Sequence, residues 1–119
     1  MPEMETILEE LNRNPAVEGA LVVGARDGLL IAAAGEPKPD AEFLAAETLE
    51  LFSSADSGMN EKFSRGSLDC LSLEGDYGHL FLKSINSEFY LLVLARNDTN
   101  LGMVRLDVRR ASEALRDEL

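Results

Sequence analysis

The sequence predicts one domain of the α/β class over residues 1–119, with helices and strands in the order α-β-β-α-β-β-β-α. Three observations support this fold class. Apolar residues recur at steps of three and four in three segments, as amphipathic helices require. Five short segments are apolar or half apolar and are bounded by turn residues such as Gly, Asn and Asp, as strands are. The 119 residues, 45% of them hydrophobic, are enough for one core, and no stretch is typical of a linker.

The first element is a helix that we predict over residues 2–12. Its apolar residues follow the helical repeat and form one face: Met4, Ile7, Leu8 and Leu11. The glutamates lie largely outside this face. Pro15 disfavours helical backbone at the residue before it, so we expect the helix to end at the segment NRNP.

Two continuous apolar runs, GALVVGA and LLIAAAG, follow the helix and predict strands near residues 19–25 and 29–34. Between them lies Asp27-Gly28, which is typical of a hairpin with a type I′ turn, where both central residues need positive φ. Glycines here also suggest a phosphate-binding loop. Such a loop must lead into a helix and carry a Lys followed by Ser or Thr, whereas a strand pattern follows Gly28. We therefore expect a turn and no bound nucleotide.

A long helix is predicted over residues 41–64, with Asp40 as its N-cap. A Gly in the middle of a helix is unfavourable, so Gly58 indicates a kink or close packing. The apolar residues occupy more than one stripe of the helical wheel: Phe43, Leu44, Ala46, Leu49, Leu51, Phe52, Ala55, Met59 and Phe63. A helix on one sheet needs only one stripe, so we expect this helix to meet a second surface as well. The alternative is a core helix with a solvated acidic face, and the wheel does not decide which side faces the sheet.

Three further strands are predicted at residues 67–74, 79–85 and 89–95, with GDYG and NSE as the turns between them. The segment FYLLVLA is uniformly apolar, as expected of a central strand that is covered on both faces. The segment SLDCLSLE is half polar and is therefore interpreted as an edge strand.

The last helix is predicted over residues 101–118, with Asn100 as its N-cap. One side of it is apolar, and arginines align along another side: Arg105, Arg109 and Arg116. We expect these arginines to pair within the chain, with Glu5 and Glu9 of the first helix, if the two terminal helices lie side by side. Such exposed pairs would add little stability.

Composition argues against several classes of partner. The chain has 11 Lys and Arg against 22 Asp and Glu, so its formal net charge is −11. That charge disfavours binding to nucleic acid and to anionic lipid surfaces. No apolar run is long enough to span a bilayer, and the acidic start lacks the pattern of a signal peptide. We therefore expect a cytoplasmic protein that does not insert into membranes.

The residue types that carry catalysis or bind metal are few. Cys70 is the only cysteine, so the chain cannot form an intramolecular disulfide or a cysteine zinc cluster. His79 is the only histidine, and no motif marks a Ser-His-Asp or Cys-His set around it. We interpret Cys70 as a packing residue and His79 as a surface or partly buried residue. We accordingly expect no catalytic residues, no cofactor and no metal.

Several segments, taken in chain order, carry a resemblance to a known family. They are LEELNRNPAVEGALVVGARDGLLIAA, an Ala-rich acidic helix, and then RGSLDCLSLEG, GHLFLKSI, YLLVLA and NLGMVRLDVRRASEAL. Together they resemble the roadblock / dynein light chain domain family over about residues 7–115. The resemblance implies an α+β sandwich, in which a five-stranded antiparallel sheet has the long helix on one face and the two terminal helices on the other.

The same resemblance implies a homodimer, or a higher oligomer. Members of the family pair their long helices and join their third strands edge to edge into a ten-stranded sheet. This arrangement would use the half-polar strand at residues 67–74 and the additional apolar stripe of the long helix. We expect these residues at the dimer interface: Leu44, Thr48, Leu51, Phe52, Ala55, Met59, Asp69, Leu71 and Leu73.

For function, the resemblance implies a non-catalytic platform. The bacterial MglB-like members of the family regulate a Ras-like GTPase, so this chain would bind the GTP-loaded form of such a GTPase and modulate its hydrolysis. It would do so by ordering the groups of the GTPase, since no arginine-finger motif can be matched here. The residues expected at this partner-binding surface are Glu47, Glu50, Ser54, Asp56, Ser57 and Glu61.

The sequence is also compatible with three other functions. The chain can be an adaptor subunit of a motor or signalling complex that leaves hydrolysis unchanged. It can also be a small-ligand sensor, which requires a pocket. An enzymatic function is the least favoured of the three, because catalysis would have to use one His, one Cys and no recognised motif.

Overall fold

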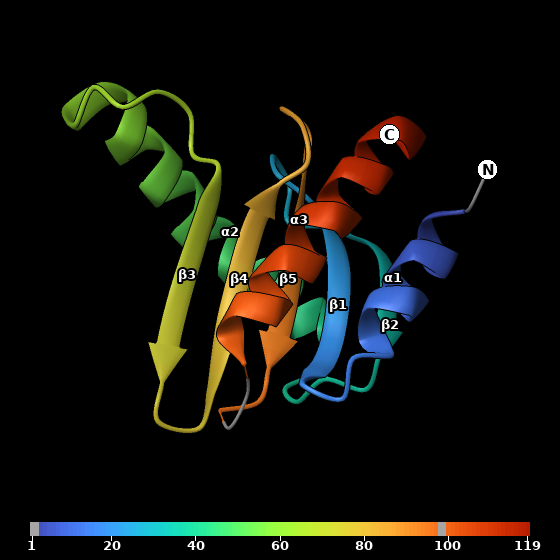
Figure 1. Ribbon diagram of the computed structural model, residues 1–119. Helices are drawn as coiled ribbons and strands as arrows, with labels where there is room; N and C mark the ends of the chain where they lie inside the picture. Colours follow the sequence, from blue (N-terminus) through green and yellow to red (C-terminus); the bar gives the residue numbers. More distant parts are fainter. Residues whose placement is uncertain (1–2, 98–99) are drawn as a thin grey trace.

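The computed structural model describes residues 3–97 and 100–119 and shows one sheet with helices on both of its faces (Figure 1). The elements, in chain order, are α1 (Met4–Asn12), β1 (Val17–Gly24), β2 (Leu30–Gly35), α2 (Ala41–Ser57), the π-helical turn η1 (Gly58–Lys62), β3 (Cys70–Gly75), β4 (Gly78–Ser84), β5 (Phe89–Ala95) and α3 (Leu101–Glu118). Over the described residues the sheet has five antiparallel strands in the order β2-β1-β5-β4-β3. α2 lies on one face, and α1 and α3 lie side by side on the other. The predicted α+β sandwich is therefore confirmed.

The sheet separates two apolar cores, because successive residues of a strand point to opposite faces. In β1, Ala20 and Val22 pack toward α1 and α3, whereas Leu21 and Val23 pack toward α2. β5 contributes to both cores, and all its residues after Phe89 are buried. The prediction that FYLLVLA is a central strand is thus confirmed, and its uniformly apolar sequence follows from having helices on each side.

The terminal helices begin and end close to the predicted residues. α3 covers the predicted residues 101–118, and the Oδ1 of Asn100 accepts a hydrogen bond from the Met103 N–H (3.3 Å), so the predicted cap is confirmed. α1 begins at Met4, and Pro2, where the prediction began, lies outside the described residues. After α1, the Oδ1 of Asn14 accepts from the Ala16 N–H (2.9 Å) and helps to turn the chain into β1.

The hairpin between β1 and β2 is present, but the predicted type I′ turn is wrong. Gly28 has a φ of +70°, whereas Asp27 does not have positive φ. The Gly24 N–H donates to the Leu29 carbonyl and the Gly28 N–H donates to the Gly24 carbonyl, both at 2.9 Å, so the loop contains four residues. Asp27 stabilises this longer loop because its Oδ1 accepts from the Leu29 N–H at 3.0 Å. A strand follows the loop, as predicted, and no helix begins there.

The long helix is not regular to residue 64 as predicted. α2 ends at Ser57, and the π-helical turn η1 begins at Gly58, the residue that the sequence marks as a kink. The Phe63 N–H donates to the Gly58 carbonyl at 2.9 Å, and a Cβ at Gly58 would lie 3.3 Å from the Phe63 ring. The absence of a side chain at Gly58 therefore lets the Phe63 ring fold back over the helix end.

The predicted capping role of Asp40 is also wrong. Asp40 occupies the N-cap position of α2, and its carbonyl accepts from the Leu44 N–H at 3.0 Å, but its carboxylate makes no capping hydrogen bond. The Asp40 side chain is exposed. Water can therefore satisfy the first N–H groups of this helix, and the carboxylate is not required there.

Candidate interaction surfaces

The inward side of α2 is fixed to the sheet by a buried polar contact. The Thr48 Oγ1 donates to the Leu44 carbonyl at 2.8 Å and lies 2.7 Å from the Tyr90 hydroxyl of β5. Burial raises the pKa of the Tyr90 phenol, and the hydrogen bond to Thr48 lowers it by a smaller amount. The Phe52 ring stacks on the Tyr90 ring, with 4.4 Å between centroids and 10° between planes. These contacts determine which side of α2 faces the sheet.

Because of this orientation, three of the residues expected at the dimer interface lie instead in the core of the chain. Leu44, Thr48 and Phe52 are buried within the chain itself, against the sheet. Their burial leaves them little surface to offer a partner. The helical wheel alone could not show this, because the contact with Tyr90 that orients α2 joins residues 42 positions apart.

The outward and lateral sides of α2 carry exposed apolar residues. Phe43 is 53% exposed and Leu51 is 47% exposed, and Phe63, beyond η1, is 65% exposed. Ala55 and Met59 are half-buried at the border of the core. An amphipathic helix that met only the sheet would place polar residues at these outward positions. α2 therefore presents apolar surface away from the sheet, and its contact with a second surface stays a prediction.

Polar residues of the expected partner surface lie on the outward side of the same helix. Glu47, Glu50, Ser54 and Ser57 are exposed and follow one another at steps of three and four, so they share one face. Glu61 is also exposed, on η1. The chain has no basic residue between Glu42 and Glu61, so every charged residue of this surface is acidic.

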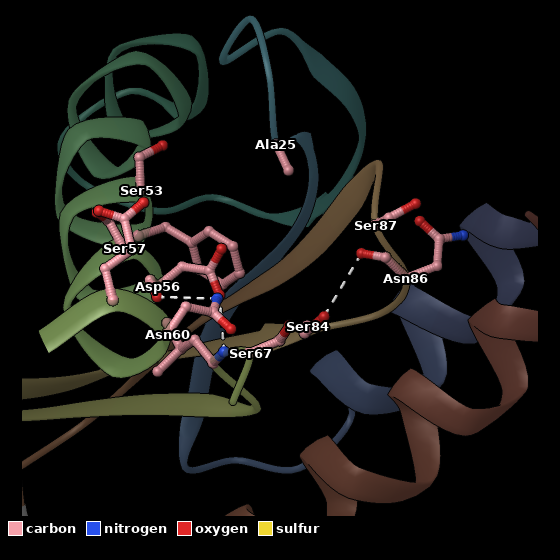
Figure 2. A pocket seen from close by; sticks show the side chains of 12 residues that line it. Ala25, Ser53, Asp56, Ser57, Asn60, Ser67, Ser84, Asn86 and Ser87 are labelled. Atoms are coloured by element: carbon pink, nitrogen blue, oxygen red, sulfur yellow. Dashed lines mark hydrogen bonds between the residues drawn. The ribbon is translucent and has the colours of Figure 1, made fainter. Parts of the chain in front are cut away.

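Asp56 differs from the rest of this set, because it holds the chain in place. It is half-buried, and its Oδ1 accepts hydrogen bonds from the Leu68 N–H (2.7 Å) and the Asn60 Nδ2 (3.3 Å). These contacts tie the end of α2 to the segment that enters β3. A hollow of about 540 Å³ lies beside Asp56 and Asn60, and serines from three parts of the chain are among the residues that line it (Figure 2): Ser53, Ser57, Ser67, Ser84 and Ser87.

β3 is an edge strand, as predicted, and it is exposed more than the other strands. Leu71 and Leu73 are half-buried on the α2 face, and Cys70, Ser72 and Glu74 are exposed. Asp69, just before the strand, is 79% exposed on its side chain and pairs with the Lys83 Nζ at 2.7 Å. Lys83 lies opposite Cys70 in the register of β3 and β4. Sequence reasoning did not single out Lys83, because only the strand register brings it next to this edge.

The arginines of α3 do not pair with α1 as expected. The ion pairs within residues 3–97 and 100–119 are Lys83–Asp69 and Arg96–Glu18. α1 and α3 do lie side by side, and the hydrogen bond beside that contact joins Asn14, two residues after α1, to α3: the Asn14 Nδ2 donates to the Asp107 Oδ2 (2.9 Å).

The arginine stripe faces the opposite side of α3. The Arg105 guanidinium lies over the Phe81 ring, 5.8 Å from its centroid, and the Arg116 Nε donates to the Ile85 carbonyl at 2.9 Å. Arg105 and Arg109 line a groove of about 490 Å³ between α3 and the exposed strand β3. The stripe therefore belongs to the β3 side of the molecule, and the distance of α1 from that side explains why the predicted pairing is wrong.

The groups that could carry catalysis are separated. Cys70 is exposed on β3, and desolvation of its thiol by the surrounding residues raises the pKa of the thiol, whereas the nearby charge of Lys83 lowers it by a smaller amount. His79 is half-buried on β4, opposite Glu74. Over the part of the chain that the structure describes, no group of three or more His, Cys, Asp and Glu side chains is placed to hold a metal ion. Likewise, no helix among these residues is long and apolar enough to cross a membrane.

The fold is a five-stranded antiparallel sheet with helices on both faces. Its exposed features are the acidic and apolar outward side of α2 and the edge strand β3, and they are typical of a protein that binds other proteins. The family model described as Roadblock/LC7 domain matches residues 3–95. The chain therefore belongs to the Roadblock/LC7 domain family, as the resemblance of its segments implied.

Individual relatives agree with this assignment. The uncharacterized protein MJ1340 of Methanocaldococcus jannaschii is 32% identical over 113 residues, which cover 95% of this chain and 96% of the relative. A Roadblock/LC7 domain structure from Streptomyces avermitilis superimposes with a TM-score of 0.87 at 20% identity, covering 98% of this chain and 97% of the other. The structure of Myxococcus xanthus MglB superimposes with a TM-score of 0.86 at 25% identity, covering 96% of this chain and 85% of MglB.

Proposed function

We propose that this protein is a homodimeric, non-catalytic regulator that binds a Ras-like small GTPase and modulates its GTP hydrolysis. The observation that carries the proposal is the outward side of α2. It places exposed Leu51 next to a continuous acidic face on a helix whose other side is fixed in the core. Membership in the Roadblock/LC7 family and the likeness to MglB support a GTPase as the partner.

In this proposal the apolar and the acidic side chains of α2 and η1 have different roles. The apolar residues Leu51, Ala55 and Met59, together with β3, pair with a second copy of the chain. The acidic face, represented by Glu47 and Glu50, contacts the GTPase. A platform of this kind changes the hydrolysis rate by favouring one arrangement of the GTPase's own groups, so this chain needs no catalytic residue.

The test uses a purified Ras-like small GTPase from the same organism. We expect the purified protein to bind the GTP-loaded GTPase and to change its single-turnover rate of GTP hydrolysis. Combining Glu47→Arg and Glu50→Arg should weaken binding about tenfold or more, because charge reversal at the centre of a polar interface creates like-charge contacts. Glu113→Arg is the matched control, since Glu113 is exposed on α3, on the other face of the sheet.

The possible results distinguish the proposed regulator from an adaptor and test whether the contact lies on α2. Absence of binding in both nucleotide states would contradict the proposed partner. Binding with an unchanged hydrolysis rate would replace the regulator by the adaptor function. If the Glu47→Arg/Glu50→Arg variant and the Glu113→Arg variant weaken binding equally, the contact with the GTPase does not lie on α2.

A further inference from the structure

The groove between α3 and β3 is a basic site on an acidic protein. Its charged lining consists of three basic residues and one acidic residue: Lys83, Arg105, Arg109 and Asp69. Because the chain as a whole carries a formal net charge of −11, this basic groove is a local reversal of its charge. The Arg105 guanidinium lies over Phe81, which belongs to the core under α1 and α3. The groove therefore opens on the face of the sheet opposite to the acidic side of α2.

The two arginines of the groove are available to a ligand, whereas the lysine is not. Over residues 3–97 and 100–119, neither Arg105 nor Arg109 pairs with a carboxylate, and both residues are exposed. Lys83 is paired with Asp69 at 2.7 Å, and only 12% of its side chain is exposed. Arg116, the third arginine of the stripe, donates its Nε–H to a backbone carbonyl at 2.9 Å. The stripe thus leaves two guanidinium groups for contacts outside the chain.

The spacing of these two arginines indicates what kind of anion they can bind. Arg105 and Arg109 are four residues apart in α3, so they lie on one side of the helix, about 6 Å apart along its axis. In an extended peptide, side chains two residues apart lie on one side at a separation of about 6.8 Å. Two carboxylates at that separation can each accept charge-assisted hydrogen bonds from one guanidinium group. The Phe81 ring, 5.8 Å from the Arg105 guanidinium, helps to hold that group in position.

We propose that the basic groove binds an extended, acidic peptide segment of a partner protein, whose two carboxylates, separated by one residue, contact Arg105 and Arg109. This site goes beyond the contact with a GTPase and does not depend on it. A single helical turn, about 10 Å across, would fill most of a groove of about 490 Å³, so an extended segment fits better than a helix. Cys70 and Leu106 also line the groove and give apolar side chains of the segment a surface to pack against.

Charge favours a short peptide over nucleic acid or an anionic membrane. Both of these carry rows of phosphates that extend beyond the groove, where acidic residues surround it. Glu74 of β3 lies on the same face of the sheet, and Glu113 lies one helical turn beyond Arg109 in α3. Phosphates above these glutamates would be repelled, whereas two carboxylates of a peptide contact only the arginines.

Binding of a labelled peptide tests the proposal. The probe is a fluorescein-labelled peptide of about eight residues, in which one leucine separates two glutamates and the other residues are uncharged. We expect its fluorescence anisotropy to give a Kd of about 100 µM at low salt, rising about fivefold or more at high salt, because salt screens exposed charges. The same peptide with two glutamines should bind at least about tenfold more weakly. Equal binding of the two peptides, or no binding up to about 1 mM, would overturn the proposal.

Substitutions in α3 test where the peptide binds. Arg109→Gln should raise the Kd about tenfold, because it removes one of the two cations without disturbing the core. Arg105→Gln should have a similar effect, and thermal unfolding checks that the variant remains folded where Arg105 covers Phe81. Arg110→Gln is the matched control on the α1 side of α3 and should leave the Kd unchanged. Equal effects of Arg109→Gln and Arg110→Gln would overturn the proposed site.

Other occupants of the groove would give different results. If a single-stranded oligonucleotide or phosphatidylserine vesicles bind more tightly than the peptide, and Arg109→Gln abolishes that binding, the groove recognises phosphates and the proposed partner is wrong. If the peptide dissociates self-associated wild-type protein in sedimentation, a second copy of the chain occupies the groove, and the proposal is overturned as well. Failure to bind a GTPase would contradict only the proposed function, because the peptide is tested with this protein alone.

Discussion

The two edge strands, β2 and β3, end the same sheet in opposite ways. β2 is rich in alanine, and Ala32 and Ala34 are buried where α1 packs against the strand. β3 alternates leucine with polar residues, and none of its residues is fully buried. Small residues thus let a helix approach and cover one edge, whereas half-buried leucines and exposed backbone groups leave the other edge able to accept a strand.

The largest expected contrast comes from placing a charge on each edge. Ala34→Asp should lower the free energy of unfolding by about 3 kcal/mol or more, because it buries an unpaired carboxylate under α1. Leu73→Asp should lower it by only about 1 kcal/mol, since Leu73 is half-buried, but should shift the protein toward monomer. Urea unfolding and sedimentation measure the two effects, and equal loss of stability from both variants would contradict the comparison.

A matched pair of glycines sharpens the same contrast at the backbone. Gly35→Ala, at the end of β2, should cost about 3 kcal/mol, because φ is +83° and a Cβ would lie 2.5 Å from the Glu18 carbonyl oxygen. Gly66→Ala, before β3, has a similar φ of +85° but open space around the new Cβ. It should therefore cost only about 1 kcal/mol of strain. Thermal unfolding of both variants measures the difference, which is the cost of close packing at the closed edge.

The smallest expected effect concerns the thiol on β3. Cys70 is exposed, but its pKa is raised above the ordinary value by desolvation, so less of it is thiolate at pH 8 than in a short peptide. Alkylation should therefore be slower than for the peptide at pH 8, with a rate that rises to higher pH. Lys83→Ala should slow it further, because Lys83 favours the thiolate. Alkylation that is faster than in the peptide would show that the basic groove outweighs desolvation.

Much of the fold could be predicted from the sequence, because its signals are local. The periodic apolar faces predicted all three helices, and α3 was predicted with its bounds and its Asn100 cap. FYLLVLA and SLDCLSLE predicted which strand is central and which lies at an edge. The turn after β1 was placed correctly, but its type was not, since Asp27 stabilises a four-residue loop through its own side chain.

The candidate site could be predicted only in part, because its residues depend on contacts between distant segments. The acidic character of α2 was evident from Glu47 and Glu50, but Thr48 and Phe52 belong to the core, since Tyr90 of β5 orients the helix. The sequence showed that the arginines of α3 form a stripe, but it did not show which residues of the folded chain lie next to them. Lys83 gave no sequence signal at all.

The amino-acid sequence alone predicts the type and order of the helices and strands, and it shows the acidic net charge and the lack of a recognised catalytic motif. Periodicity, turn residues and composition are properties of neighbouring residues, which one chain displays directly. Which side of α2 remains outside the core, and the position of Arg105 beside β3 rather than beside α1, follow from contacts in the folded chain. Both features depend on strand register and helix packing, which bring together residues that are far apart in the sequence and that no local pattern connects.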